Sequence, residues 1–237
     1  MTMDLSKILF LDIETIPQYK SFDEAPEGYQ KLWGDKAKFL IREEEDTVES
    51  TYERAGIYAE FGRIVCISVG IVGQKGALRE LRLKSFYGDD EKVLLQEFAD
   101  LLMKHFNGPD HLLCGHNGKE FDFPYIARRM LINQVKVPKM LDTAGKKPWE
   151  VAHLDTMQMW KFGDFKNFTS LKLLAHVFDI PSPKDDIDGS QVAGVYWEEN
   201  DLERIVRYCE KDVLTLIQVY LSMTQQAKLS DVELGSE

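Results

Sequence analysis

The sequence predicts an α/β fold with a central mixed five-stranded sheet flanked by helices. The chain begins with three strand patterns, at residues 8–12, 63–72 and 80–86. Two shorter strand patterns then alternate with helical patterns, and they lie at residues 111–117 and 151–157. The 237 residues are 44% hydrophobic and 29% charged, which is ordinary for a globular protein and sufficient for a substantial core.

Hydrophobic patterns indicate where each strand lies in the sheet. Residues 8–12 (ILFLD) and 63–72 (RIVCISVGIV) are almost wholly apolar, as expected of inner strands covered on both faces. Residues 80–86 (ELRLKSF) alternate between apolar and polar positions, which predicts a half-exposed strand. The short segments 111–117 (HLLCGHN) and 151–157 (VAHLDTM) are predicted as the fourth and fifth strands.

Helical spacing and capping residues predict the helices. Asp89 and Asp90 precede apolar residues at helical spacing, and the sequence Asn-Gly-Pro at 107–109 ends that helix. Pro124 suits the first turn of a helix that runs to about Asn133. Three further helices are expected, from about residue 170, near residue 192 and over 201–221.

An acidic segment at residues 20–60 interrupts this pattern and is predicted to be a helical insertion. It follows Glu14 closely, so it either borders the site of that carboxylate or is a solvated elaboration of the surface. The chain contains no internal repeat and no low-complexity linker. We therefore expect a single domain over residues 1–237, with a polar C-terminal tail from about residue 228.

Charge and cysteine content narrow the classes of function. The net charge of −11 argues against a protein that coats nucleic acid, although residues 119–184 hold 11 lysines and arginines against 7 acidic residues. Cys66, Cys114 and Cys209 lie in apolar segments, which predicts reduced core residues and no disulfide or zinc site. The N-terminus carries no apolar signal region, and no apolar stretch is long enough to span a bilayer. We expect a cytoplasmic protein without membrane contact.

Two carboxylates, Asp12 and Glu14, stand at the end of the first predicted strand. Side chains two positions apart on a strand point to the same side. These carboxylates should therefore repel each other unless a positive group lies between them.

Two later segments carry further acidic candidates. Asp122 lies between Phe121 and Phe123 at a predicted helix start, where aspartate is common as a helix-start residue and is less often a ligand. In the helix over 201–221, Tyr208 and Asp212 lie together at the edge of the apolar stripe. A carboxylate there loses water and needs compensation, and a salt bridge would explain Asp212 taken alone.

Three motifs hold these residues in order: Asp-x-Glu-Thr from Asp12, Asn-x-x-x-Phe-Asp from Asn117 to Asp122, and Tyr-x-x-x-Asp from Tyr208 to Asp212. In order, spacing and context they resemble the DEDDy group of 3′–5′ exonucleases. The sequence is most similar to the proofreading exonuclease domain of family B DNA polymerases, in a free-standing bacterial form. The resemblance runs from about residue 7 to residue 221, and the tyrosine of the third motif indicates the subgroup.

The resemblance implies a ribonuclease H-like fold and phosphodiester hydrolysis with two divalent metal ions, Mg²⁺ or Mn²⁺, which prefer carboxylate oxygens. It implies that Asp12 bridges the two metals. Glu14 and Asp212 are expected to complete the site that carries the attacking water, and Asp122 to support the second metal. Tyr208 is expected to orient that water, since a tyrosine with an unperturbed pKa of about 10 is a poor base at neutral pH.

The resemblance also implies a substrate, the 3′ end of single-stranded nucleic acid, with DNA favoured over RNA. Residues matching Thr15, Asn117 and Phe121 contact the terminal nucleotides in the polymerase domains, although a core phenylalanine is an equally good interpretation of Phe121. Since the sequence holds no polymerase domain, a polymerase or repair partner would act in trans. Asp155 (structural or supporting carboxylate) and Lys184 (phosphate contact or part of a turn) have no firm role.

Two other interpretations stay open from the sequence. Asp-Ile-Glu-Thr resembles the first motif of haloacid-dehalogenase-type phosphatases, which requires aspartate where Glu14 stands and leaves Tyr208 unexplained. A catalytically inactive nuclease fold could bind nucleic acid or a polymerase, although all four carboxylates and the tyrosine are present. Metal-dependent release of mononucleotides separates these interpretations.

Overall fold

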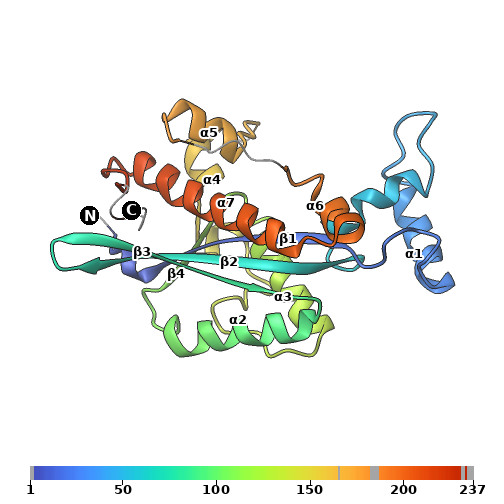
Figure 1. Ribbon diagram of the computed structural model, residues 1–237, viewed down its shortest axis with the longest axis horizontal. Coiled ribbons are helices and arrows are strands. Elements are labelled where there is room, and N and C mark those ends of the chain that lie inside the picture. Colours follow the sequence, from blue (N-terminus) through green and yellow to red (C-terminus); the bar gives the residue numbers. More distant parts are fainter. Residues whose placement is uncertain (1–2, 165, 182–186, 231–232, 234–237) are drawn as a thin grey trace.

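A computed structural model describes residues 3–164, 166–181, 187–230 and 233. The strands span Ile8–Pro17 (β1), Gly62–Lys75 (β2), Leu78–Tyr87 (β3), Leu112–Gly115 (β4) and Leu154–Asp155 (β5). They form one five-stranded sheet in the order β3-β2-β1-β4-β5 (Figure 1). β1, β2 and β3 pair antiparallel, whereas β4 runs parallel to β1 and β5 runs parallel to β4.

Helices cover both faces of the sheet, which confirms the predicted fold class. α2 (Glu91–His105) and α3 (Asp122–Ile132) lie on one face, and the long α7 (Leu202–Met223) crosses the other (Figure 1). α4 (Thr156–Lys161) and α5 (Leu171–Val177) contact α7. The remaining helical elements are η1 (Leu5–Lys7), α1 (Glu27–Ala37), η2 (Ser50–Ile57), η3 (Pro148–Glu150), α6 (Val192–Gly194) and the π-helical η4 (Val195–Glu199).

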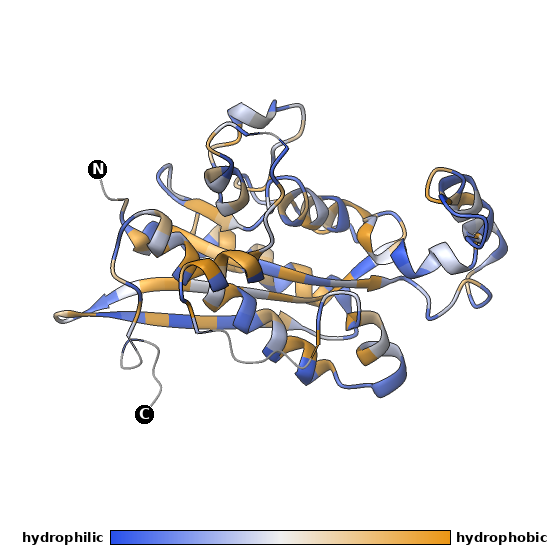
Figure 2. Cartoon of the chain, turned by 90° about the horizontal axis from the view of Figure 1, so that it is seen from above, coloured by the Kyte–Doolittle hydropathy of each residue, from blue (hydrophilic) through white to orange (hydrophobic). Residues whose placement is uncertain are grey.

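The core lies in two layers, one on each face of the sheet. Ile8 and Phe10 of β1 pack against α7, where the ring centroids of Phe10 and Tyr220 are 5.3 Å apart. Leu9 and Leu11 pack on the opposite face, in the cluster that includes α2 and α3. Figure 2 shows hydrophobic residues concentrated in these central elements. Even-numbered positions at the start of β1 therefore face α7.

β1 is longer than the sequence predicts. The prediction gives an apolar strand over residues 8–12 with Asp12 and Glu14 at its end, but β1 continues to Pro17 and pairs with β2 along this stretch. The register shifts between Glu14 and Thr15. The acidic side chains do not end the strand because β2 continues beside them and pairs with their backbone. Asp12 and Glu14 are thus held inside a sheet, on the side that faces α7.

β5, in contrast, is shorter than predicted, with two residues in place of seven. The chain turns into α4 at this point because Asp155 is the N-cap of that helix. Its carboxylate accepts hydrogen bonds from the backbone N–H groups of Met157, at 3.0 Å, and Gln158, at 3.2 Å. Capping by aspartate favours the start of a helix over a longer strand.

The insertion, residues 20–60, lies at one end of the sheet and contains α1 and η2 (Figure 1). Residues 38–49 between these two helices form turns and loops, so the predicted helical character holds for only part of the segment. The insertion has a small aromatic core of its own, in which Trp33 is fully buried and its ring lies 5.6 Å from that of Tyr52. The indole N–H of Trp33 donates to the carbonyl oxygen of Val48 at 3.0 Å.

Residues after α7 pack against the outer edge of the sheet. The side chain of Gln218 exchanges hydrogen bonds with the backbone of Leu229, which is buried. The carboxylate of Glu233 accepts from Nε of Arg79 at 3.1 Å. Its carbonyl oxygen accepts from the N–H of Leu81 at 3.2 Å. Arg79 and Leu81 lie on β3, the outermost strand.

The three cysteines are buried and free of disulfides, as predicted. Cys114 packs in the layer between the sheet and α7, and Cys66 and Cys209 pack together in a neighbouring cluster. Within the described part of the chain, no helix is both long enough and apolar enough to cross a membrane.

Candidate active site

A cavity of about 520 Å³ lies between β1 and α7, with further walls from η2, from the start of α3 and from residues 189–193. Its lining includes six of the residues that the sequence predicts for the site: Asp12, Glu14, Thr15, Phe121, Tyr208 and Asp212. Asp122 is buried and does not line the cavity. Asn117 lies in the turn before α3 and does not line it either.

Asp12, Glu14 and Cys209 form a tight cluster at this cavity. One potential ligand atom from each residue lies within 4.8 Å of the other two. The thiol of Cys209 donates to the carboxylate of Asp12, with 3.6 Å between Sγ and Oδ2. Burial raises the pKa of the Cys209 thiol, so it stays protonated and is a hydrogen-bond donor here.

Burial raises the pKa of Asp12 and of Glu14 well above their ordinary values. The negative charges of Asp122 and Asp212 raise that of Asp12 further. Among the described residues, no ion pair involves Asp12, Glu14 or Asp122. Clustered carboxylates without a basic partner are unfavourable unless a cation joins them. Their hard oxygen atoms fit a divalent ion such as Mg²⁺ or Mn²⁺.

Asp122 is the first residue of α3 and is 4% exposed. Its side chain does not cap the helix, and a backbone hydrogen bond from Ile13 of β1 reaches it instead. Burial raises the pKa of Asp122 to about 7, although the hydrogen bonds from the backbone act in the opposite direction. A buried carboxylate that faces β1 fits the ligand interpretation better than the helix-start interpretation.

Tyr208 and Asp212 project from α7 into the cavity, one helical turn apart. Burial raises the pKa of Tyr208, and the charges of Asp212 and Glu14 and a hydrogen bond with Asp212 add to this shift. The phenol therefore stays protonated at neutral pH. Tyr208 can donate or accept a hydrogen bond but cannot act as a base there.

Asp155 holds the turn that precedes α3. Besides capping α4, its carboxylate accepts from the backbone N–H groups of Asn117, at 3.1 Å, and Lys119, at 3.0 Å. Asn117 has a left-handed backbone with φ of 62°, which asparagine tolerates better than most residues. Asp155 is thus a structural carboxylate that positions Phe121 and Asp122. The predicted contact of Asn117 with a nucleotide stays a prediction.

η2 brings to the cavity two residues that the sequence pattern did not indicate, Arg54 and Ile57. Arg54 is the only lysine or arginine among the described residues that line it. η2 lies this close to β1 because of Gly56, where a Cβ atom would be 3.0 Å from the carbonyl carbon of Ile16. No motif or periodicity in residues 50–57 signals this contact, which depends on tertiary packing.

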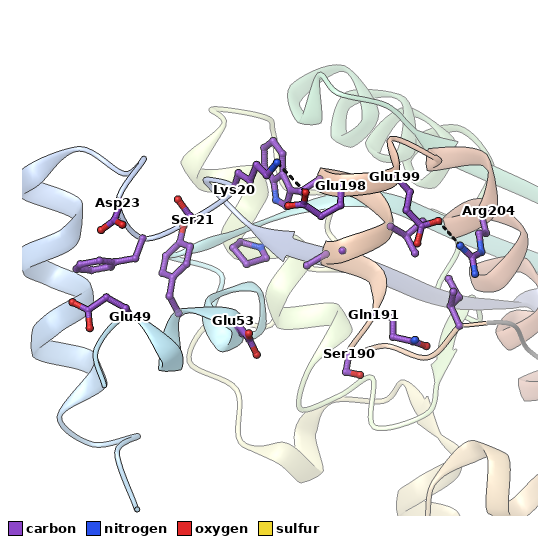
Figure 3. A pocket seen from close by; sticks show the side chains of 18 residues that line it. Lys20, Ser21, Asp23, Glu49, Glu53, Ser190, Gln191, Glu198, Glu199 and Arg204 are labelled. Carbon is purple, nitrogen blue, oxygen red and sulfur yellow. Dashed lines mark hydrogen bonds and ion pairs between the residues drawn. The ribbon is translucent and has the colours of Figure 1, made fainter. Parts of the chain in front are cut away.

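Two more cavities adjoin the site. The larger, of about 640 Å³, shares Glu53 and Ser190 with it and is drawn in Figure 3. Its basic side chains, Lys20 and Arg204, pair with glutamates, and its other charged lining residues are acidic. A phosphate backbone would be repelled there. Lys184, interpreted above as a phosphate contact or as part of a turn, lies outside the described residues.

The smaller cavity, of about 210 Å³, lies on the other side of the catalytic candidates on α7. It shares Tyr208 and Asp212 with the site and is also lined by Ser170 and Lys172 at the start of α5. Tyr208 and Asp212 of the site thus share a cavity with the start of α5.

Residues 57–234 match the family described as "Predicted 3'-5' exonuclease related to the exonuclease domain of PolB". The match includes Asp122, Tyr208 and Asp212 and begins after Asp12 and Glu14. No curated protein matches the chain. Among solved structures, the RNase domain of the yeast Pop2 protein is 12% identical, with a TM-score of 0.39, over 90% of this chain and 79% of that one. Because the family match covers well over half of its residues, the chain belongs to the family of predicted 3′–5′ exonucleases related to the exonuclease domain of PolB.

Proposed function

We propose that the protein is a metal-dependent 3′–5′ exonuclease that removes nucleotides one at a time from the 3′ end of single-stranded DNA. The observation that carries this proposal is the set of carboxylates around one cavity in a chain of this family. Asp12 and Glu14 lie inside a strand, Asp212 faces them from α7, and Asp122 lies buried next to β1.

These four carboxylates would hold two divalent ions, Mg²⁺ or Mn²⁺. Bound ions of this kind supply a nucleophile at neutral pH and stabilise charge on the oxygens of the phosphodiester. The protein's own contribution is to hold the carboxylates at fixed positions on a sheet and a helix, where burial keeps competing water away.

Tyr208 is proposed to orient the attacking water through its hydroxyl group. Its raised pKa keeps the proton on the phenol, so the residue positions the water and does not deprotonate it. The hydrogen bond with Asp212 in turn fixes the direction of the hydroxyl group.

The walls of the cavity are proposed to bind the terminal nucleotides. Phe121 is half-buried, with its ring centroid 5.4 Å from that of Tyr125, so one part of the ring remains available to a base. Ile57, which is 50% exposed, offers an apolar contact from the opposite wall. Arg54 supplies the positive charge that a phosphate requires beside so many carboxylates.

A time course with a 5′-labelled single strand, blunt duplex DNA and RNA, each with Mg²⁺, Mn²⁺ or EDTA, tests the proposal. The expected result is a ladder that shortens by one nucleotide at a time, fastest on single-stranded DNA and absent with EDTA. Asp12→Ala is the control for contaminating nucleases. Endonucleolytic fragments, or faster digestion of blunt duplex, would contradict the proposal. Metal-dependent binding without any shortening would favour the inactive binding module.

A further inference from the structure

The loop between α4 and α5 exposes two phenylalanines. Phe162 is 92% exposed and Phe168 is 69% exposed. Single exposed apolar residues are common on protein surfaces. Two large aromatic side chains exposed on one short loop instead indicate a surface for a partner. Neither residue contributes to the described hydrophobic clusters of the core.

The loop begins with an unusual backbone conformation and ends at a hydrogen-bonded residue. Phe162 has a left-handed backbone with φ of 44°, a conformation that a phenylalanine rarely adopts, and Gly163 follows with φ of 90°. At the other end, His116 forms hydrogen bonds of 2.9 Å with the carbonyl oxygen of Thr169 and with the hydroxyl group of Thr156. These contacts join Thr169, next to Phe168, to His116 just after β4 and to Thr156 of α4.

Basic side chains accompany the two rings. Nζ of Lys161 lies 4.2 Å from the ring centroid of Phe168, and Lys166 and Lys172 are exposed. The stretch 161–172 contains three lysines and one acidic residue, in a chain whose net charge is −11. The positive local charge therefore favours an anionic partner. The exposed aromatic rings favour a partner with planar groups, such as bases, that can stack on them.

The loop also leads to the candidate active site. Ser170, at its C-terminal end, and Lys172, in the first turn of α5, line the cavity of about 210 Å³ that Asp188, Tyr208 and Asp212 also line. A strand whose 3′ end lies beside Tyr208 and that leaves on this side would pass Ser170, two residues from Phe168 in the chain. The charged residues that line the larger cavity in Figure 3 are five acidic side chains and two basic ones, Lys20 and Arg204, which pair with glutamates.

We propose that Phe162 and Phe168, with Lys161 and Lys166, bind single-stranded DNA upstream of its 3′ end, outside the catalytic cavity. This inference rests on the proposed exonuclease function and adds a second contact region for the same strand. Bases stack on the exposed rings and the lysines contact the phosphates, a combination typical of single-strand binding without sequence preference. The consequence is a preference for strands long enough to reach the loop.

The test compares kcat/KM for oligothymidylates from the trimer to the dodecamer. In the double variant Phe162→Ala/Phe168→Ala, we expect the ratio of kcat/KM for dodecamer over trimer to fall about fivefold or more, because one stacked base contributes at least that factor to affinity. Phe39→Ala is the matched control, since Phe39 is 83% exposed and lies on the insertion. An unchanged ratio in the double variant would overturn the proposal.

Salt dependence gives an independent measurement. For the dodecamer, Lys161→Ala or Lys166→Ala should reduce the slope of log affinity against log salt by about 0.7, the value for one phosphate of a single strand.

Fluorescence anisotropy with a labelled dodecamer and Ca²⁺ separates this inference from the exonuclease proposal. If the wild type binds the strand but hydrolyses none with Mn²⁺, only the proposed function fails. If the double variant Phe162→Ala/Phe168→Ala binds the dodecamer like the wild type, this inference fails.

Discussion

The thiol of Cys209 on α7 lies against Asp12 on β1, with Sγ 3.6 Å from the carboxylate oxygen Oδ2 and 3.5 Å from the carbonyl oxygen. This contact joins the helix that carries Tyr208 to the strand that carries Glu14. Since the thiol donates, it favours the ionised form of Asp12 and partly offsets the effect of burial on its pKa.

Removing this donor should weaken metal binding in a pH-dependent way. In Cys209→Ala the pKa of Asp12 rises further, so protons compete more strongly with the metal. We expect Mn²⁺ affinity to fall several-fold at about pH 6 and less at about pH 8, where the carboxylate ionises more readily. Cys209→Ser, which keeps a donor, should lie nearer the wild type in a Mn²⁺ titration by calorimetry. Equal losses at both pH values would mean that packing, not the hydrogen bond, matters.

The raised pKa of Asp122 makes the metal-free protein sensitive to rising pH. A carboxyl group whose pKa is higher in the folded than in the unfolded state stabilises the fold below the unfolded pKa of about 4. That contribution is lost as the pH rises through the folded value, which is about 7 for Asp122. In EDTA, the stability difference between Asp122→Asn and the wild type should therefore grow in favour of the variant from about pH 5 to about pH 8. Thermal unfolding across this range measures it, and a difference that shrinks would contradict the assignment.

Asp212→Asn separates metal binding from stability. The substitution removes one negative charge from the cluster, so the metal-free variant should be at least as stable as the wild type. The rise in melting temperature on adding Mn²⁺ should be largely lost, because that rise depends on binding to the folded state. Asp142→Asn, which makes the same change in charge at an exposed aspartate, is the control. A large loss of metal-free stability would identify Asp212 as a structural salt-bridge partner.

Tyr208→Phe and Asp12→Ala should fail in different ways. Loss of one well-placed catalytic hydrogen bond lowers the rate by roughly 10²–10³. Tyr208→Phe should show a loss of that order in single-turnover hydrolysis while binding Mn²⁺ normally, because the ring and its packing remain. Asp12→Ala should lose both metal binding and detectable activity. If Tyr208→Phe matches the wild-type rate across pH, the tyrosine serves packing alone.

Arg54 is expected to contact a phosphate of the substrate. Arg54→Ala should lower kcat/KM by roughly ten- to a hundredfold, the range for a hydrogen bond to a charged group, and Arg54→Lys should recover part of it. Arg42→Ala is the matched control, since Arg42 is exposed on the same insertion and does not line the cavity.

A strand with one neutral methylphosphonate linkage identifies the phosphate that Arg54 contacts. At the contacted position, the neutral linkage should slow the wild type and add little to the defect of Arg54→Ala. If the effects of linkage and substitution multiply at every position, Arg54 has no direct contact with the strand.

The sequence predicts those parts of the site that depend on local periodicity. Alternation along a strand places Asp12 and Glu14 on one face, and helical spacing places Tyr208 beside Asp212, as the structure has them. Asp122 has no such local signature, because a helix start is an ordinary position for aspartate. Only the order of all three motifs indicated it.

Features that depend on tertiary packing could not be predicted in this way. The extension of β1 beyond Asp12 requires β2 as a neighbour, and the short β5 follows from the capping of α4 by Asp155. Arg54 reaches the cavity because Gly56 allows η2 to approach β1 closely. A contact between distant segments leaves no periodic signal in either of them.

The docking of Glu233 on β3 has a consequence for the behaviour of the protein in concentrated solution. β3 is the outermost strand of the sheet, and the free backbone groups of such a strand can pair with a strand of another molecule. Glu233 occupies the N–H of Leu81 with its carbonyl oxygen and holds Arg79 with its carboxylate. Glu233 thus shields this stretch of β3 from edge-to-edge aggregation, a protective role that is independent of catalysis.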